Sequence, residues 1–213
     1  MAIQDLRTKI RCVIYDCDGV LFDSLESNIR LYNDLCRSVS RPPLTEEEIR
    51  YVQSHTVFEA IHFLFGHAGD LEKRAFGELK NIDFRHYIDH LKMEPDLMET
   101  LSLLKERDIL RAISTNRTTT MRYIMEKFNL GPYFEMVVTA LDVKNPKPHP
   151  ESVKKILDAF NLKKEEVIFV GDSEVDQQTA KASGIRFIAF RNLDVAQDLF
   201  IENHLDLLKL LQI

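Results

Sequence analysis

The amino-acid sequence predicts an α/β protein, in which helices cover both faces of a doubly wound parallel sheet and a helical segment is inserted after the first strand. Short apolar runs of strand length recur along the chain, and segments with apolar residues three and four positions apart separate them. Strands that alternate with helices in this way form parallel sheets covered on both sides. One stretch near the N-terminus breaks the alternation, because it carries helical patterns without a convincing strand.

Five apolar runs are the candidate strands, and their continuous apolar character is typical of strands buried on both faces. They lie at residues 12–15, 109–113, 136–138, 167–170 and 186–190. Three of the segments between them have an apolar face at helical spacing. These faces consist of Leu97, Leu101 and Leu104, of Met121, Ile124, Met125 and Phe128, and of Val153, Ile156, Leu157 and Phe160.

The stretch that breaks the alternation contains four helical patterns, at residues 28–39, 45–53, 57–65 and 71–79. Thr45 is the expected N-cap of the second helix, and Glu48 completes a capping box. Connections between a strand and a helix are usually about two to six residues long, so this stretch predicts an inserted helical subdomain. We expect a core domain of residues 1–19 and 91–213 and an insert of residues 20–90.

Composition excludes several classes of protein. With 45% apolar and 29% charged residues among 213, the chain should form a core and fold. A net charge of -6 argues against a nucleic-acid-binding surface, and no apolar run approaches the ~20 residues that span a bilayer. Three cysteines without C-x-x-C spacing and an N-terminus without a signal-peptide pattern favour a cytoplasmic location. We therefore expect a soluble protein that binds neither nucleic acid nor a membrane.

Acidic residues follow two of the predicted strands. Asp16 and Asp18 come directly after the first strand, and Asp172 and Asp176 follow the fourth. Ligands of an open parallel sheet bind beyond the carboxyl ends of its strands, so these carboxylates should meet at one edge. Two carboxylates ~4 Å apart repel by roughly 4 kcal/mol at an effective dielectric of about 20, and Lys147 adds only one positive charge. Either some of the pKa values rise steeply or a divalent cation lies among them, and the hard oxygen ligands favour Mg²⁺.

Four segments together resemble the motifs of the haloacid dehalogenase (HAD) superfamily, in the order of that family. They read Asp16-x-Asp18-Gly19-Val20-Leu21-x-Asp23-Ser24, Thr115–Asn116, Lys147–Pro148 and Gly171–Asp172–Ser173-x-x-Asp176. The similarity spans nearly the whole chain and implies a Rossmann-like core with a C1-type cap formed by the insert. The Asp-Gly-Val-Leu-Phe-Asp-Ser and Lys-Pro-x-Pro-Glu runs resemble the phosphoglycolate-phosphatase-like and β-phosphoglucomutase-like branch.

The resemblance implies a phosphoryl-transfer mechanism. Asp16 would be the nucleophile that forms an aspartyl-phosphate, and Asp18 would serve as general acid and then as general base. Mg²⁺ would be held by Asp16, the backbone carbonyl of Asp18 and Asp172. Asp176 would orient Lys147 or a metal-bound water.

A second group of residues is implied to hold the phosphate. The Thr115 hydroxyl, the Asn116 amide and the Lys147 ammonium would contact the phosphoryl oxygens, with Gly19 nearby. Ser114 also offers a hydroxyl at the end of the second strand, but the pairing with Asn116 favours Thr115 for this role.

Local structure is the favoured explanation for several polar residues in or near the insert. His55 lies between two predicted helices of the insert, where cap-bearing members of the family carry a substrate-selecting loop, and it is a candidate substrate ligand. The alternative is a helix cap formed by Ser54 or Thr56. We expect structural roles for Asp23 and for Ser24, which could cap the helix that enters the insert.

The function implied is a Mg²⁺-dependent phosphatase, similar to phosphoglycolate phosphatases, that hydrolyses a small-molecule phosphate ester as a monomer or homodimer. The alternative is a phosphomutase of the β-phosphoglucomutase type, which would return the phosphoryl group to a sugar. A more distant alternative is a receiver-like phospho-acceptor signalling module, because such domains also combine an acidic cluster with Thr and Lys. Carbon–halogen cleavage is disfavoured, since the dehalogenases of the superfamily lack a carboxylate at the position of Asp18.

Overall fold

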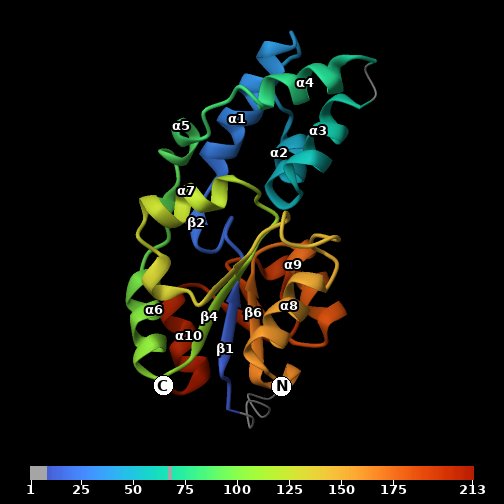
Figure 1. The fold of residues 1–213 in the computed structure, drawn as a ribbon. Coiled ribbons are helices and arrows are strands. Elements are labelled where there is room, and N and C mark those ends of the chain that lie inside the picture. Colours follow the sequence, from blue (N-terminus) through green and yellow to red (C-terminus); the bar gives the residue numbers. More distant parts are fainter. Residues whose placement is uncertain (1–8, 67–68) are drawn as a thin grey trace.

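The computed structural model describes residues 9–66 and 69–213, and these form a six-stranded parallel sheet with helices on both faces (Figure 1). The strands of this sheet are β1 (Cys12–Tyr15), β4 (Leu110–Ser114), β5 (Met136–Val138), β6 (Val167–Gly171), β7 (Arg186–Phe190) and β8 (Phe200–Ile201). Their spatial order is β5-β4-β1-β6-β7-β8. β1 therefore lies at the centre, between the strands that carry the other predicted motifs.

Helices divide between the sheet domain and the insert. Those of the sheet domain are α6 (Leu97–Glu106), α7 (Thr120–Lys127), α8 (Glu151–Phe160), α9 (Glu174–Ser183) and α10 (His204–Leu211). Those of the insert are α1 (Leu25–Ser38), α2 (Glu46–Ser54), α3 (Val57–Phe65), α4 (Leu71–Leu79) and α5 (Arg85–Ile88).

Each face of the sheet has its own hydrophobic core. Val13 and Tyr15 of β1 point to the face covered by α6, α7 and α10, whereas Cys12 and Ile14 point to the face covered by α8 and α9. Successive side chains of a strand point to opposite faces, so burial on both faces requires a continuous apolar run. This explains why the strands read as uninterrupted apolar segments in the sequence.

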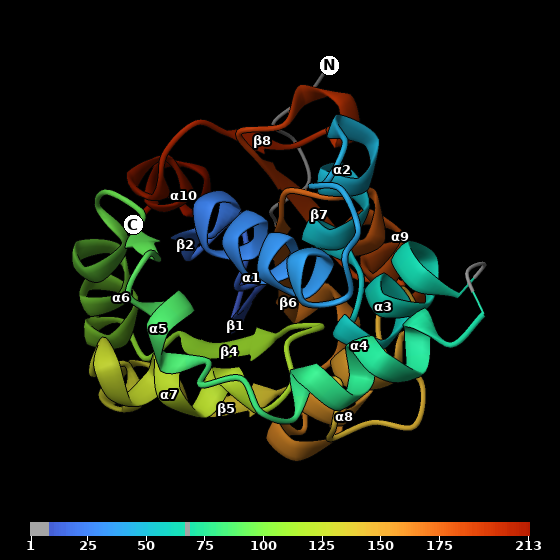
Figure 2. The same cartoon turned by 90° about the horizontal axis from the view of Figure 1, so that it is seen from above.

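The helices of the insert pack around a third core, separate from the two cores of the sheet. Leu35, Ile61, Phe65 and Ala75 are almost completely buried within it. Figures 1 and 2 show these helices above the carboxyl ends of the strands, where they cover that edge of the sheet. The boundaries of the insert at residues 20 and 90 stay a prediction.

Both connections between the insert and the sheet domain run through one short antiparallel ribbon. It consists of β2 (Phe22–Asp23) and β3 (Lys92–Met93), with Phe22 opposite Met93. The expectation that residues 20–90 contain no strand was wrong at β2. Two residues cannot show a strand periodicity, and this pairing forms only when the two ends of the insert meet.

The predicted elements agree closely with the structure elsewhere. The runs at 12–15, 136–138 and 186–190 are strands with those bounds, and the run at 109–113 is shifted by one residue. Helices α3 and α4 have the predicted bounds, and α2 begins with the predicted capping box of Thr45 and Glu48. Helix α1 begins at Leu25, three residues before the predicted start. β3, β8, α5, α9 and α10 were not predicted.

Within residues 9–66 and 69–213, no helix combines the length and the apolar character that crossing a membrane requires. The longest, α1, has 14 residues, whereas a span needs about 20. The N-terminal residues on which the signal-peptide prediction rests lie outside the described residues.

Candidate active site

Three predicted site residues follow three adjacent strands. Asp16 comes after β1, Thr115 after β4 and Asp172 after β6. The Asp16 N–H donates to the carbonyl of Val170 at 3.0 Å, and the Thr115 N–H donates to that of Val138 at 3.0 Å, so both residues extend the hydrogen-bonding ladder. The parallel strands therefore bring these side chains to one edge of the sheet.

Lys147 joins two aspartates. Its Nζ lies 2.8 Å from Asp16 Oδ1 and 2.6 Å from Asp176 Oδ1, and the side chain is almost completely buried. Burial disfavours the charged ammonium, but the charges of both aspartates outweigh burial and raise the pKa of Lys147 above its usual value. The second carboxylate oxygen of Asp176 accepts hydrogen bonds from the N–H and the hydroxyl of Ser173 at the start of α9. Asp176 is thus fixed as a partner of Lys147, which is one of its two predicted roles.

Asp16, Asp172 and Asp176 form an acidic cluster that fits a divalent cation. One carboxylate oxygen of each lies within 4.8 Å of the others. Burial and then the charge of Asp176 raise the pKa of Asp16 to about 7, and burial, Asp176 and Asp16 also raise the pKa of Asp172. Lys147 balances only one of the three negative charges. The potential ligand atoms are hard carboxylate oxygens, and their negative charge is only partly balanced. Such ligands suit Mg²⁺.

Gly19 makes room for the Asp172 carboxylate. Its φ is +74°, and a Cβ at this position would lie 1.9 Å from Asp172 Oδ2. Both the backbone conformation and the close approach require glycine here. The structure therefore places Gly19 against a predicted metal ligand, whereas the sequence predicted it beside the phosphate.

Asp18 is held by an arginine that the sequence analysis did not identify. Arg117 Nε lies 2.7 Å from Asp18 Oδ2, and Arg117 Nη2 lies 2.6 Å from Asp18 Oδ1. The side chains are only 11% and 15% exposed, so this is a bidentate ion pair largely shielded from water. Burial disfavours the charged guanidinium, but the charge and hydrogen bonds of Asp18, together with the neighbouring Cys17 and Asp16, raise the pKa of Arg117 above its usual value. The signal in the sequence was an arginine directly after Thr115–Asn116.

The two hydroxyls at the end of β4 point to different environments. Thr115 lines the cavity beside Asp16, and its hydroxyl oxygen accepts the backbone N–H of Arg117 at 3.1 Å. Ser114 instead donates to the hydroxyl of Ser152 on α8, at 2.8 Å and away from the cavity. Of these two hydroxyls, the one at Thr115 is available to a ligand.

The side-chain amide of Asn116 is committed to the backbone of the neighbouring loop. Its Oδ1 accepts the N–H of Lys147 at 3.0 Å, and its Nδ2 donates to the Lys147 carbonyl at 3.1 Å and to the Ser54 carbonyl at 3.3 Å. Asn116 therefore holds the loop that presents Lys147. Its backbone N–H has no hydrogen-bond partner among the described residues and is the amide that remains for a phosphate oxygen.

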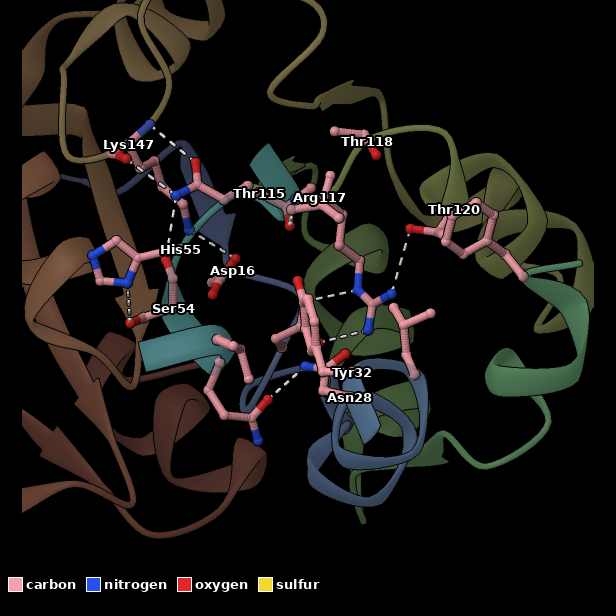
Figure 3. Close-up of a pocket in the computed structure, with 17 residues that line it drawn as sticks. Asp16, Asn28, Tyr32, Ser54, His55, Thr115, Arg117, Thr118, Thr120 and Lys147 are labelled. Atoms are coloured by element: carbon pink, nitrogen blue, oxygen red, sulfur yellow. Dashed lines mark hydrogen bonds and ion pairs between the residues drawn. The ribbon is translucent and has the colours of Figure 1, made fainter. Parts of the chain in front are cut away.

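A cavity of about 60 Å³ lies between these groups and the insert. Figure 3 shows Asp16, Thr115 and Lys147 together on one side of it and Arg117, Tyr32 and Thr120 on the other. Its walls contain residues of both the sheet domain and the insert. From the insert they include Asn28, Leu31, Tyr32, Val52, Gln53, Ser54, His55, Val57 and Phe84.

His55 lies in the wall that the insert contributes, as its candidate role requires. Its ring stacks on Tyr51 with ring centres 3.8 Å apart, and Nδ1 lies 2.9 Å from the Tyr51 carbonyl and 3.2 Å from the Ser54 hydroxyl. The predicted alternative also holds, because Thr56 forms a capping box with Glu59 at the start of α3. His55 therefore lines the cavity, and the adjacent Thr56 caps the helix.

Asp23 and Ser24 have local environments. Asp23 Oδ1 accepts the N–H of Leu25 at 3.2 Å at the start of α1. Ser24 occupies the N-cap position, but its side chain makes no capping hydrogen bond. The capping role expected for Ser24 was wrong, because the preceding aspartate takes the N–H at this helix start.

Comparison with known proteins agrees with the predicted family. A family model described as haloacid dehalogenase-like hydrolase matches residues 13–190. The chain is 27% identical to phosphoglycolate phosphatase 1 of Pseudomonas aeruginosa over 188 residues, covering 84% of this chain and 68% of that protein. It is 29% identical to the phosphorylated carbohydrates phosphatase of Thermotoga maritima, covering 84% of each chain.

Solved structures show the same relationship. The crystal structure of a HAD-superfamily hydrolase of subfamily IA from Geobacter sulfurreducens is 37% identical, with a TM-score of 0.78 over 96% of this chain and 98% of that chain. A predicted phosphoglycolate phosphatase from Haemophilus somnus has the same fold, with a TM-score of 0.82 at 21% identity. The receiver-like alternative does not explain these matches. The chain belongs to the haloacid dehalogenase-like hydrolase family.

Proposed function

We propose that this protein is a Mg²⁺-dependent phosphatase that hydrolyses a small phosphorylated metabolite through an aspartyl-phosphate on Asp16. One observation carries the proposal: the Asp16 carboxylate lies at the sheet edge with the Lys147 ammonium 2.8 Å away and with Asp172 in the same acidic cluster. A nucleophile for phosphorus needs positive charge beside it, because the phosphate group it attacks is also anionic. Asp16 Oδ2 has no hydrogen-bond partner among the described residues and is the oxygen that would attack.

In the first step Asp16 forms a bond to phosphorus while the bond from phosphorus to the ester oxygen breaks. Asp18 donates a proton to that leaving oxygen, so that an alcohol is released and the phosphoryl group stays on Asp16. In the second step Asp18 takes a proton from water, and the resulting oxygen attacks the same phosphorus. The bond from phosphorus to Asp16 breaks, which releases phosphate and restores both aspartates.

Three groups of the chain are suited to hold the phosphoryl oxygens during both steps. They are the Lys147 ammonium, the Thr115 hydroxyl and the backbone N–H of Asn116. Because these groups are fixed before substrate arrives, they stabilise developing negative charge without reorganising. Asp176, which does not line the cavity, supports this by pairing with the Lys147 ammonium at 2.6 Å.

The carboxylates of Asp16 and Asp172, together with the backbone carbonyl of Asp18, would hold Mg²⁺. When bound, Mg²⁺ neutralises the repulsion between these carboxylates and the phosphate. The excess negative charge of the cluster and the close fit of Gly19 against Asp172 support this assignment.

The insert supports a small substrate. It covers the carboxyl ends of the strands, and the cavity beneath it measures about 60 Å³, which leaves room for a short ester but not for a phosphorylated protein. Covering the site also excludes bulk water from the first step, in which water would compete as a nucleophile. The names of the relatives, phosphoglycolate phosphatase and phosphorylated carbohydrates phosphatase, agree with such a substrate.

The test is phosphate release from p-nitrophenyl phosphate and from about a hundred phosphorylated metabolites in the presence of Mg²⁺. Asp16→Asn should abolish turnover while the protein keeps its melting temperature within a few degrees. Asp158→Asn, at an exposed aspartate on α8, is the matched control and should keep full activity. Retained turnover in Asp16→Asn would refute the nucleophile. Release that depends on added sugar bisphosphate would favour the phosphomutase.

A further inference from the structure

The carboxylate of Asp172 is the least restrained of the three in the acidic cluster. Asp16 and Asp176 each pair with the ammonium of Lys147. The Asp172 carboxylate has no hydrogen-bond or ion-pair partner among the described residues. Its direction is therefore determined by the backbone that carries it and by the surface of Gly19, which lies against it.

The backbone of Asp172 is held by a side chain from another strand end. Asp172 is the first residue after β6, and no backbone N–H of the described residues donates to its carbonyl oxygen. Asn192, two residues after β7, donates to this oxygen through Nδ2 at 2.7 Å. The Asn192 amide thus satisfies an acceptor that the end of the strand leaves unpaired.

The turn that carries Asn192 is itself anchored. Asn192 Oδ1 accepts the N–H of Asp194 at 3.0 Å, which fixes the orientation of the amide. Arg191 has a φ of +53°, a left-handed conformation that persists in an arginine only where its surroundings enforce it. Its guanidinium donates to the Glu202 carbonyl at 2.8 Å and forms an ion pair with the buried Glu94. These contacts hold the turn in the form that presents Asn192.

We propose that Asn192 is a positioning residue for the metal site: by holding the Asp172 carbonyl, it directs the Asp172 carboxylate toward the Mg²⁺ that the proposed function places in the cluster. The inference rests on that function. Gly19 limits movement of the carboxylate on one side, where a Cβ would lie 1.9 Å from Asp172 Oδ2. Without Asn192 the backbone of Asp172 can turn, and its carboxylate turns with it. Residues that orient metal ligands commonly change metal affinity by about 10- to 100-fold.

Calorimetric titration of the substrate-free protein with Mg²⁺ tests this inference. We expect Asn192→Ala to raise the Kd for Mg²⁺ by about tenfold or more. Asn81→Ala removes a similar contact in the insert, from Nδ2 to the Gly77 carbonyl at 3.4 Å, and as the matched control should leave the Kd unchanged. An unchanged Kd in Asn192→Ala would overturn the positioning role alone. Absence of Mg²⁺ binding by the wild-type protein would overturn the metal site of the proposed function, and this inference with it.

Asn192→Asp separates the hydrogen-bond donor from the turn. The new carboxylate can still accept the Asp194 N–H, but it places an oxygen against the Asp172 carbonyl where the donor was. Its added negative charge would by itself strengthen Mg²⁺ binding. The positioning role predicts the opposite, a Kd raised by about tenfold or more. Equal or tighter binding would overturn the proposal.

Kinetics with p-nitrophenyl phosphate separate positioning of the metal ligand from a general structural role. In Asn192→Ala the Mg²⁺ concentration for half-maximal activity should rise about tenfold or more, whereas kcat at saturating Mg²⁺ should return nearly to the wild-type value. A kcat that stays low at saturating Mg²⁺, with an unchanged half-maximal concentration, would contradict the proposal.

A crystal structure of the wild-type protein with Mg²⁺ tests the same inference and does not depend on the folding of a variant. It should show Asp172 as a ligand of Mg²⁺ while Asn192 Nδ2 still donates to the Asp172 carbonyl. A structure in which Asp172 binds Mg²⁺ and the Asn192 amide points elsewhere would overturn the proposal.

Discussion

The side chain of Asn116 binds the backbone of Lys147 on both sides, through the Lys147 N–H at 3.0 Å and the Lys147 carbonyl at 3.1 Å. The same amide nitrogen lies 3.3 Å from the carbonyl of Ser54, which is the last residue of α2 in the insert. One side chain therefore connects the loop that carries Lys147 with the insert that covers the site. Placement of Lys147 depends on Asn116 as directly as on Asp176.

Replacement of Asn116 should impair catalysis through Lys147. In Asn116→Ala both backbone hydrogen bonds of the loop are lost, and we expect kcat for p-nitrophenyl phosphate to fall by about 100-fold because a small displacement of a positioned group has this effect. Asn116→Asp keeps an acceptor for the Lys147 N–H but places a second oxygen against two carbonyls, so it should be equally impaired. Steady-state kinetics at saturating Mg²⁺ measure the effect. Full activity in both variants would contradict the positioning role.

The strands of the sheet could be predicted because burial on both faces requires a continuous apolar run in the sequence. The run at 136–138 is apolar throughout, since its side chains contact helices on one face or the other. β8, β2 and β3 form no such run. Each of these three strands has two residues, and each pairs only because tertiary structure brings another segment beside it.

The candidate site could be predicted where strand ends determine it and not where side-chain orientation does. Asp16, Thr115 and Asp172 each follow a strand in the sequence. Because these adjacent parallel strands end at the same edge of the sheet, the sequence predicts that the three residues meet there. The sequence could not show which of its 28 lysines and arginines would face Asp18. Nor could it show that the Asn116 side chain turns toward the backbone, since that depends on the path of the loop at Lys147.

Gly19→Ala should weaken metal binding. The residue has φ of +74°, and the added Cβ would overlap Asp172 Oδ2, so the carboxylate must move. We expect a loss of about 1–3 kcal/mol of stability from the backbone conformation and at least a tenfold higher Mg²⁺ concentration for half-maximal activity. Gly77→Ala is the matched control, because this exposed glycine of α4 has no atom near its Cβ and should gain up to about 1 kcal/mol. Unchanged Mg²⁺ dependence in Gly19→Ala would argue against Asp172 as a ligand.

Removal of the metal should abolish phosphatase activity and lower the stability of the protein. With EDTA the cluster of Asp16, Asp172 and Asp176 keeps only Lys147 as its counter-charge, whereas Mg²⁺ relieves the repulsion. A ligand at 100 times its Kd stabilises by about 2.7 kcal/mol, so the melting temperature should rise measurably on addition of Mg²⁺. Asp172→Asn should abolish most of this rise. Equal melting curves of the wild-type protein in EDTA and in Mg²⁺ would exclude a site at this cluster.

A buried histidine at the start of α10, His204, links stability to pH. His204 Nε2 donates to the carbonyl of Val20 at 2.9 Å, while Nδ1 is buried and has no partner among the described residues. The ring stacks on Phe190 with ring centres 4.6 Å apart. Burial lowers the pKa of His204 to about 4, since protonation of Nδ1 would place a charge in this apolar environment.

We predict that His204 makes the folded state less stable as the pH falls from about 6.5 to about 4. In this window the unfolded chain binds a proton at this histidine and the folded chain does not, so acid favours unfolding; the difference of about 2.5 pKa units corresponds to about 3 kcal/mol. Asp16 acts in the opposite direction over this whole range, because its folded pKa is raised to about 7. The effect is therefore measured by urea unfolding in EDTA, as the difference between the wild-type protein and His204→Gln at each pH. That difference should shrink by about 3 kcal/mol between pH 7 and pH 4. Parallel pH profiles for the wild-type protein and His204→Gln would show that this ring does not couple folding to acid.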